Sequence, residues 1–517
     1  MAKNKKVEIS LEEKLEKALV PVEEQPYKIP NNWVWTRLGE ISKLSGGSGF
    51  PEKYQGFLDK NIPFYKVGSL KNIDDNFYIE NSENYIDENI LDKIKAKLFS
   101  KNTIIFAKIG EAIKLNRRAI LKENSCIDNN LMALVSNSSC YFRYVYFWLK
   151  KEDLYKYSQA TTVPSIRQST LEELKFPLPP LNEQKRIVEK LDFLFDKTKK
   201  AKEIIEEIKV DIENRKISIL DRAFKGVLTS KWRNGNKTSD VRELLKSIND
   251  EKIKKWEEDC LQAEKNGNKK PKKPIIKEIE DMIVPVEEQP YKLPDSWVWV
   301  RLGDLSELIS GYAFDSHDFK EKSDFQVLRL GNIKDNFLIL DKQPVFIETL
   351  VAKRANNSLC YEDDILVTMT GTRNKRDYFF TVKISKNQEF YFNQRVGCIR
   401  CSMSKISNYI YYILKVKFIL DQIFATETGS VNQGNISIKA IASLTIPLPP
   451  LEEQQEIVRI LDEVLENENK VKELLELEER IDILEKSILN KAFKGELGTQ
   501  NNSDEPAIEL LKEILNK

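Results

Sequence analysis

The chain contains 517 residues, of which 41% are hydrophobic and 32% charged, and its formal net charge is +1. This length allows about three to four domains of ordinary size. No apolar run approaches the roughly 18 residues of a membrane span, and six scattered cysteines do not form a disulfide framework. The N-terminal lysines have no apolar core behind them, so we expect no secretory signal and a cytoplasmic location.

The first half of the chain predicts a compact α+β domain. The W-V-W segment at 33–35 predicts a strand with both tryptophans on one face. The β-branched run at 103–107 predicts another strand, and residues 141–157 predict a helix. Residues 176–180 (FPLPP) are expected to be extended, because residues before proline avoid helical geometry.

A long helix is predicted directly after this proline segment. Residues 181–225 contain neither Pro nor Gly, and their apolar residues recur mostly three or four positions apart. Glu183 lies in the first turn, where the helix dipole favours acids, and Gly226 supplies a C-terminal stop. A fully helical segment of this length would span about 65 Å.

The second half repeats this order after a lysine- and glutamate-rich bridge at 230–281, which we expect to be partly helical and partly linker. The expected elements are strands at 297–299, 365–370 and 379–384, a helix at 407–424, an extended segment at 446–450 and a long helix at 451–494. The two long helices are expected to pair with each other as a coiled coil. The alternative is that each packs along its own domain.

Three segments occur twice in the same order. They are VPVEEQPYKIPNNWVWTRLGEI at 20–41 and its counterpart at 284–305, PLPPLNEQKRIVEKLD at 177–192 and PLPPLEEQQEIVRILD at 447–462, and ILDRAFKGVL at 219–228 and ILNKAFKGEL at 488–497. Offsets of 264 to 270 residues greatly exceed the period of a solenoid, so a whole domain plus a helix has been duplicated. This nearly cyclic order of segments suits a pseudo-two-fold particle.

The sequence lacks the usual signatures of an enzyme. It contains no G-x-x-x-x-G-K-[ST], no G-x-G-x-x-G between a strand and a helix, and no Asn/Asp-Pro-Pro-aromatic tetrad of an amino-methyltransferase. The single histidine, His317, excludes His-pair metal sites and disfavours a histidine-based triad. Cys398 and Cys401 form a lone C-x-x-C, whereas a structural zinc site needs four ligands. We therefore expect neither a catalytic residue nor a metal site.

The motifs W-x-W-x-R-L-G, P-L-P-P-L-x-E-Q and A-F-K-G-x-L, present twice and in order, resemble the specificity subunit of type I restriction-modification systems over nearly the whole chain. The resemblance implies an α+β fold with two globular target-recognition domains in a pseudo-two-fold arrangement, separated by two long antiparallel helices that form a coiled coil. The expected boundaries are a first target-recognition domain at 1–180, a first spacer helix at 181–228, a bridge at 229–283, a second target-recognition domain at 284–450, a second spacer helix at 451–498 and a closing segment at 499–517.

The resemblance also implies a function: sequence-specific DNA binding without catalysis. The chain would read a bipartite DNA target and direct the methyltransferase and restriction subunits to it. Because the two domains diverge between their shared junctions, we expect the target to be asymmetric. The implied partners are double-stranded DNA, two methyltransferase (modification) subunits and restriction/translocase subunits, with no membrane. No cofactor is expected on this chain; S-adenosylmethionine, ATP and Mg²⁺ are expected on the partner subunits.

Polar, glycine-containing loops are the candidates for contact with DNA, because loops present side chains to a groove while the core holds them. These are 45–49, 110–118 and 161–168 in the first domain and 310–314, 371–377 and 429–435 in the second, and the amides at 129–130 and 393–394 offer readout of adenine. The candidate residues are Ser45, Ser48, Lys114, Asn116, Arg117, Arg118, Asn129, Asn130, Arg167, Gln168, Tyr312, Thr372, Arg373, Asn374, Lys375, Arg376, Asn393, Gln394, Arg395, Ser430, Asn432 and Gln433.

Two other functions stay open at this point. One is a DNA methyltransferase or nuclease with an unrecognised active site, since carboxylates are abundant. The other is a coiled-coil tether whose domains do not bind DNA. The aromatic residues Phe193 and Phe195, with Leu191 and Leu194, nearly ring the first long helix. They are suited either to docking of a partner subunit or to packing on the chain's own domain.

Overall fold

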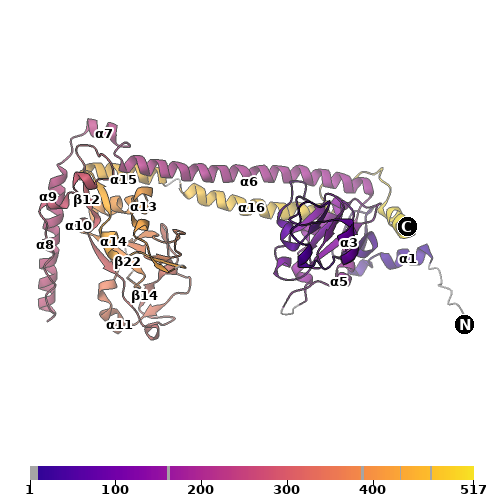
Figure 1. The fold of residues 1–517 in the computed structure, drawn as a ribbon, viewed down its shortest axis with the longest axis horizontal. Coiled ribbons are helices and arrows are strands. Elements are labelled where there is room, and N and C mark those ends of the chain that lie inside the picture. Colours follow the sequence, from indigo (N-terminus) through magenta and orange to yellow (C-terminus); the bar gives the residue numbers. More distant parts are fainter. Residues whose placement is uncertain (1–9, 160–162, 386–388, 431, 466–467) are drawn as a thin grey trace. The chain divides into compact units, whose positions relative to one another are not determined.

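The computed structural model describes residues 10–159, 163–385, 389–430, 432–465 and 468–517 and forms two compact units. Unit 1 comprises Met1–Glu206 and Leu474–Lys517, and unit 2 comprises Glu207–Glu473. Each unit contains one globular domain, the beginning of the long helix that follows it, and the end of the other long helix (Figure 1).

The domain of unit 1 is built on two β-sheets. Its strands are β1 (Val34–Arg37), β2 (Ser42–Gly46), β3 (Ile62–Tyr65), β4 (Tyr78–Ile79), β5 (Tyr85–Ile86), β6 (Leu98–Phe99), β7 (Ile104–Ala107), β8 (Arg118–Leu121), β9 (Ser125–Ile127), β10 (Leu131–Ser136) and β11 (Lys175–Leu178). One sheet has the order β2-β10-β7-β8-β4 and the other β5-β3-β9-β6. Most pairs are antiparallel, but β4 runs parallel to β8 and β3 parallel to β9. A separate pair, β1 with β11, joins the predicted tryptophan strand to the proline segment.

Helices close the core of unit 1. They are α1 (Leu11–Ala18), α2 (Leu38–Ile41), α3 (Glu88–Ile94), α4 (Phe142–Lys151), α5 (Gln168–Glu172), the first part of α6 (Leu181–Phe224), the last part of α16 (Glu468–Phe493) and α17 (Ala507–Asn516). Six consecutive residues of α4, Tyr144 to Leu149, are buried, so this helix is enclosed on all sides rather than on one face. The chain ends pack together, since α1 contacts α17 and the Ala507 N–H donates to the Asn32 carbonyl.

The domain of unit 2 repeats the main sheet and adds small ones. Its strands are β12 (Val298–Arg301), β13 (Ser306–Ser310), β14 (Phe325–Leu328), β15 (Ile333–Lys334), β16 (Phe337–Leu338), β17 (Phe346–Ile347), β18 (Ile365–Thr368), β19 (Thr370–Gly371), β20 (Thr381–Lys383), β21 (Phe390–Phe392), β22 (Val396–Cys401), β23 (Thr428–Ser430), β24 (Gln433–Asn435) and β25 (Thr445–Leu448). The sheet orders are β13-β22-β18-β20, β17-β14-β21, β19-β24-β23, β15-β16 and β12-β25.

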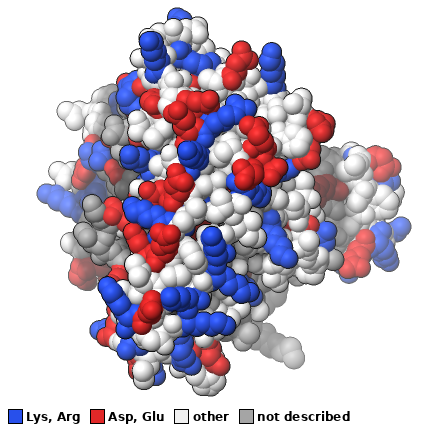
Figure 2. Space-filling model, turned by 90° about the vertical axis from the view of Figure 1, so that its left-hand side faces the viewer, with Lys and Arg blue, Asp and Glu red and all other residues white. Residues whose placement is uncertain are grey.

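The helices of unit 2 include most of the bridge between the repeats. They are α7 (Ser230–Gly235), α8 (Val241–Lys265), α9 (Ile279–Met282), α10 (Leu302–Leu305), α11 (Thr349–Arg354), α12 (Ser407–Ile413), α13 (Lys417–Ala425), α14 (Ile438–Ala442), α15 (Leu451–Leu465) and the end of α6. The first turns of α8 bury Leu244, Leu245 and Ile248 in the core, whereas the rest of the helix is charged. Figure 2 shows Lys and Arg interspersed with Asp and Glu on the visible face, in keeping with the near-neutral total.

The two long helices form as expected. Helix α6 is continuous over 44 residues, a length of about 66 Å. Helices α15 and α16 cover the second one, whose residues 466 and 467 lie outside the described residues. In unit 1, α6 and α16 are antiparallel neighbours, because the Thr198 hydroxyl donates to Glu485 (2.7 Å) and Lys202 pairs with Asp482 (2.7 Å). The predicted α+β fold class, with two domains and long connecting helices, is confirmed.

Two shorter helices differ from the prediction. The helix expected at 141–157 ends at Lys151, because Glu152 and Asp153 are extended and Asp153 begins a 3₁₀ turn instead. The helix expected at 407–424 is broken into α12 and α13 at Val416, which is also extended. This break allows Ile410 and Ile419, which lie on separate helices, to enter the same core.

The repeated motifs of the sequence meet inside each unit. In unit 1, the Trp33 indole N–H donates to Glu183 (2.8 Å), and the Thr499 hydroxyl donates to the same carboxylate (3.1 Å). Phe493, from the end of α16, packs on Tyr144 with ring centroids 5.2 Å apart. The W-x-W, P-L-P-P-L-x-E-Q and A-F-K-G-x-L motifs therefore form one buried junction.

Unit 2 contains the same junction built from the other copies. The Trp297 indole N–H donates to Glu453 (2.8 Å), the Thr229 hydroxyl donates to it (2.6 Å), and Phe224 packs on Tyr409 at 5.2 Å. In each unit, the junction is completed by the end of the long helix that began after the other domain.

Candidate nucleic-acid interface

Four segments far apart in the sequence converge at one edge of the main sheet in unit 1. The Ser48 N–H donates to the Ile127 carbonyl (2.9 Å), and the Lys108 N–H donates to the Asn130 carbonyl (3.0 Å). The Ile166 N–H in turn donates to the Lys108 carbonyl (2.9 Å). We call these segments (residues 45–49, 108–110, 129–130 and 163–168) the loop edge of unit 1.

Unit 2 has a matching loop edge, formed by residues 310–314, 369–377, 393–395, 428–430 and 432–436. The Met369 N–H donates to the Arg395 carbonyl (3.0 Å), and the Ile436 N–H donates to the Met369 carbonyl (2.9 Å). The Gly311 N–H donates to the Val396 carbonyl at 3.0 Å, as the Gly47 N–H does to Leu131 at 3.2 Å. The two loop edges therefore share one backbone arrangement.

A glycine holds each loop edge together. A Cβ on Gly47 would lie 2.1 Å from the Asp128 carbonyl oxygen, and one on Gly311 would lie 2.1 Å from that of Asn393. Both contacts are far inside van der Waals distance and involve backbone on the two sides. Only glycine allows this close approach, which places the amide loops at 129–130 and 393–395 beside the turns at 45–49 and 310–314.

The candidate residues of unit 1 fall into two groups. Ser45, Ser48, Asn129, Asn130, Arg167 and Gln168 lie on the loop edge, whereas Lys114, Asn116 and Arg117 follow it on the loop that leads to β8. Among the described contacts, the exposed side chains of Asn129, Arg167 and Arg117 have no hydrogen-bonding partner. Lys114 is paired with Glu111 (2.7 Å), and Gln168 donates to Glu172 (2.8 Å). Residues 161 and 162 of the predicted loop lie outside the described residues.

All the candidate residues of unit 2 lie on its loop edge. They are Tyr312, Thr372, Arg373, Asn374, Lys375, Arg376, Asn393, Gln394, Arg395, Ser430, Asn432 and Gln433. Arg376 is paired with Asp421 (2.8 Å), and Arg373 donates to the Gly429 carbonyl (3.0 Å). Gln394, Arg395 and Lys375 are exposed, and within the described residues their side-chain polar atoms have no hydrogen-bonding or ion-pairing partner. These three are the most available donors of the second loop edge.

Arg118 departs from the expectation of a solvent-facing loop side chain. It begins β8 and is only 4% exposed. Its guanidinium donates to the Asn116 carbonyl (2.8 Å) and side chain (2.8 Å) and to the Glu152 carbonyl (2.5 Å). Burial lowers the pKa of Arg118 to about 10. This arginine is held inside the domain because β8 continues the sheet one residue earlier than the loop pattern indicated.

Sequence reasoning missed two side chains that shape the loop edges. Lys97 donates from Nζ to the Ser45 hydroxyl (2.9 Å) and from its backbone N–H to the Ser48 hydroxyl (2.8 Å). Glu427 accepts from the Tyr378 hydroxyl (2.6 Å) and from the Asn374 N–H (3.3 Å). Each lies about 50 residues from the groups that it orients, and no local motif connects them.

His317 and the cysteines of the C-x-x-C segment lie in different surroundings. His317 is exposed and pairs with Asp315 (2.8 Å), which raises the pKa of its imidazole. Cys398 and Cys401 both lie on β22, and Cys398 is fully buried, which raises the pKa of its thiol. Among the described residues, no group of three or more His, Cys, Asp or Glu side chains is placed to hold a metal ion. Within the same residues, no helix is long and apolar enough to cross a membrane.

The aromatic residues of the first long helix divide between the two expected uses. Phe195 stacks on Phe147 of its own domain, with centroids 5.7 Å apart and an interplanar angle of 15°. Leu191 is fully buried in the same core. Phe193 is 56% exposed, and the Lys197 ammonium lies over its ring at 5.4 Å. Packing on the domain therefore accounts for Phe195 and Leu191 but not for Phe193.

Comparison with known proteins agrees with this arrangement. The family model for the type I restriction modification DNA specificity domain matches the chain twice, at residues 30–210 and 294–479. The chain belongs to this family. Each match contains one domain with its loop edge and the beginning of the long helix that follows.

Relatives of similar length are named as specificity subunits of type I restriction enzymes. The chain is 22% identical to the type I restriction enzyme EcoDI specificity subunit of Escherichia coli over 93% of this chain and 92% of that one. It is 24% identical to the EcoAI specificity subunit of E. coli, covering 88% of this chain and 81% of the relative. A solved chain from a study of complex assembly and conformational transition of the type I R-M system has a TM-score of 0.62 at 18% identity, over 91% of this chain and 100% of that chain. That last likeness shows the shared fold.

Proposed function

We propose that this chain is the DNA-reading subunit of a type I restriction-modification assembly. Each domain reads one half of a bipartite, asymmetric duplex target through its loop edge. The chain carries no catalytic residue of its own and directs methyltransferase and restriction subunits to the target.

The observation that carries this proposal is the pair of loop edges. Their backbones are hydrogen-bonded in the same way, and Gly47 and Gly311 make the same close approach. Their side chains differ: Lys108 of unit 1 corresponds to Met369 of unit 2, and Asn130 corresponds to Arg395. A common platform that presents different side chains suits two readers of different sequences.

The available groups match the chemistry of base edges. Arginine forms a bidentate pair with guanine, and asparagine or glutamine forms one with adenine. Unit 1 offers Asn129 and Arg167, and unit 2 offers Gln394, Arg395 and Asn432. These are exposed and unpaired in the described chain, so base contact would not break an existing hydrogen bond. We therefore expect the two half-sites to differ.

The family relationship supports a place in a larger assembly with DNA. Within that assembly, we propose that two methyltransferase subunits bring S-adenosylmethionine and that translocating restriction subunits use ATP and Mg²⁺. A near-neutral specificity subunit is workable if these subunits add phosphate contacts of their own, because phosphate contacts supply much of the affinity for DNA.

The test is selection of binding sites from randomised duplexes by the complete chain with its methyltransferase subunits. The expected product is two different short motifs separated by a fixed spacer. Arg395→Ala should relax the preference at one motif only, and Arg167→Ala at the other, each by about 1–3 kcal/mol at the affected base pair. Arg459→Ala, which removes an exposed cation of α15 already paired with Glu456, should leave both motifs unchanged.

Three results would contradict the proposal. They are selection of one contiguous motif, selection of two identical half-sites, and methyl transfer or cleavage by the purified chain alone. A DNA affinity that does not fall with salt would instead favour the tether function, because a DNA reader that neutralises phosphates loses affinity steeply as salt rises.

A further inference from the structure

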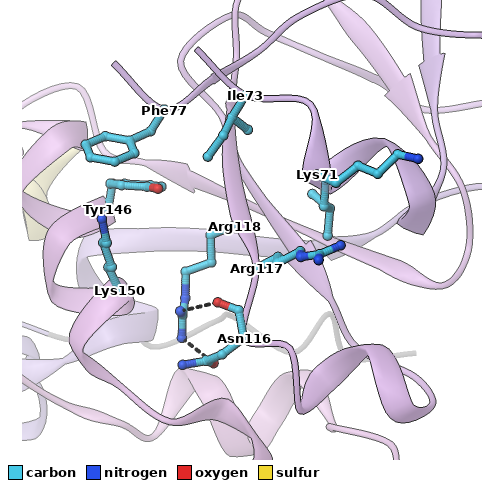
Figure 3. Close-up of a pocket in the computed structure, with 9 residues that line it drawn as sticks. Lys71, Ile73, Phe77, Asn116, Arg117, Arg118, Tyr146 and Lys150 are labelled. Atoms are coloured by element: carbon cyan, nitrogen blue, oxygen red, sulfur yellow. Dashed lines mark hydrogen bonds between the residues drawn. The ribbon is translucent and has the colours of Figure 1, made fainter. Parts of the chain in front are cut away.

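A cavity of about 270 Å³ lies in unit 1 between the turn that precedes β4, the start of β8 and helix α4 (Figure 3). Four cations line it: Lys71, Arg117, Arg118 and Lys150. Phe77 and Tyr146, stacked on each other at 5.0 Å, line it as well. No lining residue is acidic. The cavity therefore combines concentrated positive charge with an aromatic wall.

Arg118 is the buried cation of this cavity. All the hydrogen bonds that it donates go to neutral oxygens of Asn116 and Glu152, two of which Figure 3 marks. Its Nε is buried and has no partner in the described chain. A buried charge without compensation is costly, and at Arg118, which is 4% exposed, the nearby carboxylates of Glu152 and Asp153 offset the effect of burial only in part.

Lys150 adds a second cation without a carboxylate. Its ammonium lies over the rings of Phe77 (4.1 Å) and Phe195 (5.0 Å), and no carboxylate of the described chain lies within ion-pairing distance. Burial lowers the pKa of Lys150 to about 8; Arg118 and Lys202 act in the same direction, and Glu485 of α16 opposes them. With a pKa of about 8, Lys150 is still mostly protonated at neutral pH, although its buried surroundings destabilise the charge.

The equivalent lysine of unit 2 is neutralised. Lys415 follows Tyr409 as Lys150 follows Tyr144, by six residues, and the two tyrosines make the same hydrogen bond to a proline carbonyl. Lys415 pairs with Asp335 (3.4 Å) and also bonds Asn336. Of these two lysines, the one in unit 1 therefore lacks a polar partner among the described residues.

The hydrogen-bond register of one turn differs between the two units. In unit 1 the Glu80 N–H closes the turn on the Asn72 carbonyl, and in unit 2 the Ile339 N–H closes it on the Asn332 carbonyl. Residues 72–79 (NIDDNFYI) and 332–339 (NIKDNFLI) align without a gap, so the closing hydrogen bond of unit 1 is shifted by one residue along the chain (80 − 72 = 8; 339 − 332 = 7). In this register the positive φ falls on Phe77 (68°), whose ring lies over Lys150, whereas in unit 2 it falls on Asn336 (74°); Asp75 instead pairs with Lys199 (2.5 Å). A phenylalanine in the left-handed region is strained, and such strain clusters at ligand sites.

We propose that this cavity binds the phosphate group of a small ligand of the nucleotide class. The phosphate would accept charge-assisted hydrogen bonds from Lys150 and Arg117, the buried guanidinium of Arg118 would add positive charge behind them, and the ring of Phe77 would face the base. A free ligand fits better than the backbone of duplex DNA, because a cavity of about 270 Å³ admits a small molecule but not a stiff duplex.

The test is calorimetric titration of the full chain with adenosine 5′-monophosphate, inorganic phosphate and adenosine. Adenosine monophosphate should bind, phosphate should bind more weakly, and adenosine, which lacks the anion, should bind most weakly. Lys150→Met should weaken the binding of the monophosphate at least about tenfold, the effect of losing one charge-assisted hydrogen bond. Arg117→Ala, at an exposed position, should weaken it without disturbing the fold.

Lys415→Met is the matched control and should leave nucleotide binding unchanged, because it lies in unit 2. The affinity should also fall as pH rises above about 8, where Lys150 loses its proton. Absence of any binding at millimolar monophosphate would overturn the proposal, as would binding that neither unit 1 variant weakens. Displacement of the monophosphate by short duplex DNA would assign the cavity to the DNA interface instead. Duplex binding that is unchanged in Lys150→Met separates this proposal from that of DNA reading.

Discussion

Glu183 of unit 1 and Glu453 of unit 2 occupy the same place in the repeat, accept the same tryptophan hydrogen bond and are both fully buried, yet their electrostatic partners differ. Arg233 forms an ion pair with Glu453 at 2.8 Å. In unit 1 the neighbouring arginine, Arg186, pairs with Asp504 and interacts with Glu183 only through the electrostatic field, while the hydrogen bonds that Glu183 accepts among the described residues come from neutral donors. The duplication has kept the packing and the tryptophan bond while the charges around them changed.

The same contrast extends to the two solvent-facing regions. At the loop edges the backbone hydrogen bonds are shared and the side chains differ. Beside α4, a one-residue shift in the register of a turn accompanies the pairing of Asp75 with Lys199, so that Lys150 lacks the acid that Lys415 has. Positions that touch the backbone of another segment are constrained by it, whereas positions that face solvent or a ligand are free to diverge.

Removing the aromatic ring at the end of each long helix should lower the free energy of unfolding more than any other change. Comparing the two losses tests whether the two junctions are equivalent. Phe493→Ala and Phe224→Ala should each cost about 3–5 kcal/mol, because both rings are fully buried. Urea unfolding followed by tryptophan fluorescence measures this. Phe193→Ala, at 56% exposure, is the control and should change stability by less than about 0.5 kcal/mol. A neutral effect of either buried variant would show that its junction is not formed.

Replacing the buried glutamate of each junction with glutamine should lower the free energy of unfolding by different amounts in the two units. Glu453→Gln should cost about 3–5 kcal/mol, because it leaves Arg233 without a counter-charge. Glu183→Gln should cost about 1 kcal/mol, because it disturbs only neutral donors. Equal losses in the two variants, measured in the same unfolding experiment, would mean that the Arg233 pair contributes nothing.

Substitution of the two equivalent lysines, Lys150 and Lys415, should change protein stability in opposite directions. The pKa of Lys150 is about 8 in the folded state and near its ordinary value when unfolded, so the unfolded state binds more protons between about pH 8 and 10.5. Stability of the unmodified chain should therefore rise with pH across this window, and Lys150→Met should remove that rise. At pH 7, Lys150→Met should stabilise unit 1 by about 1–3 kcal/mol.

Lys415→Met provides the contrast. It should destabilise unit 2 by up to about 1 kcal/mol, because it removes the ion pair with Asp335. Thermal unfolding of both variants at pH 7 and pH 10 checks the signs. Destabilisation by Lys150→Met at pH 7 would mean that an acid compensates Lys150 after all.

The smallest expected effect is on the salt dependence of DNA binding, and it tests whether Lys375 of unit 2 and Lys114 of unit 1 contact DNA phosphates. Lys375→Ala should weaken DNA binding evenly across sequences and reduce the salt slope by about 1, since its ammonium is exposed and unpaired in the described chain. Lys114→Ala should change the slope less, because Glu111 already holds that lysine. Affinity measured at several salt concentrations distinguishes them, and a larger change for Lys114 would reverse the assignment.

Much of the fold follows from local patterns in the sequence. The long helix α6 follows from 44 residues free of Pro and Gly with apolar side chains at helical spacing. The pairing of β1 with β11 follows less directly: each segment is visible as extended, but the register that sets Trp35 opposite Pro177 is not. The ends of α4 and α12 do not follow from the pattern, because the extended residues Glu152, Asp153 and Val416 interrupt the helices without a proline or glycine to signal it.

The candidate interface was only partly accessible to sequence reasoning. The loops and their amides were identifiable from glycine and polar residues, and the structure brings them together at one edge of each main sheet. The burial of Arg118 and the roles of Lys97 and Glu427 were not identifiable, because they depend on neighbours about 35 to 50 residues away. Such contacts leave no periodic trace in the sequence.

The sequence by itself determined that a domain and its helix occur twice, that the shared motifs lie at the edges of each copy, and which family the chain resembles. It did not determine which copy of each motif meets which. Phe224 and Phe493 lie in nearly identical segments, so either could have packed on either domain. Only the tertiary structure places Phe493 on Tyr144 and Phe224 on Tyr409, because each long helix extends beyond its own domain and its apolar end is buried in the junction of the other unit.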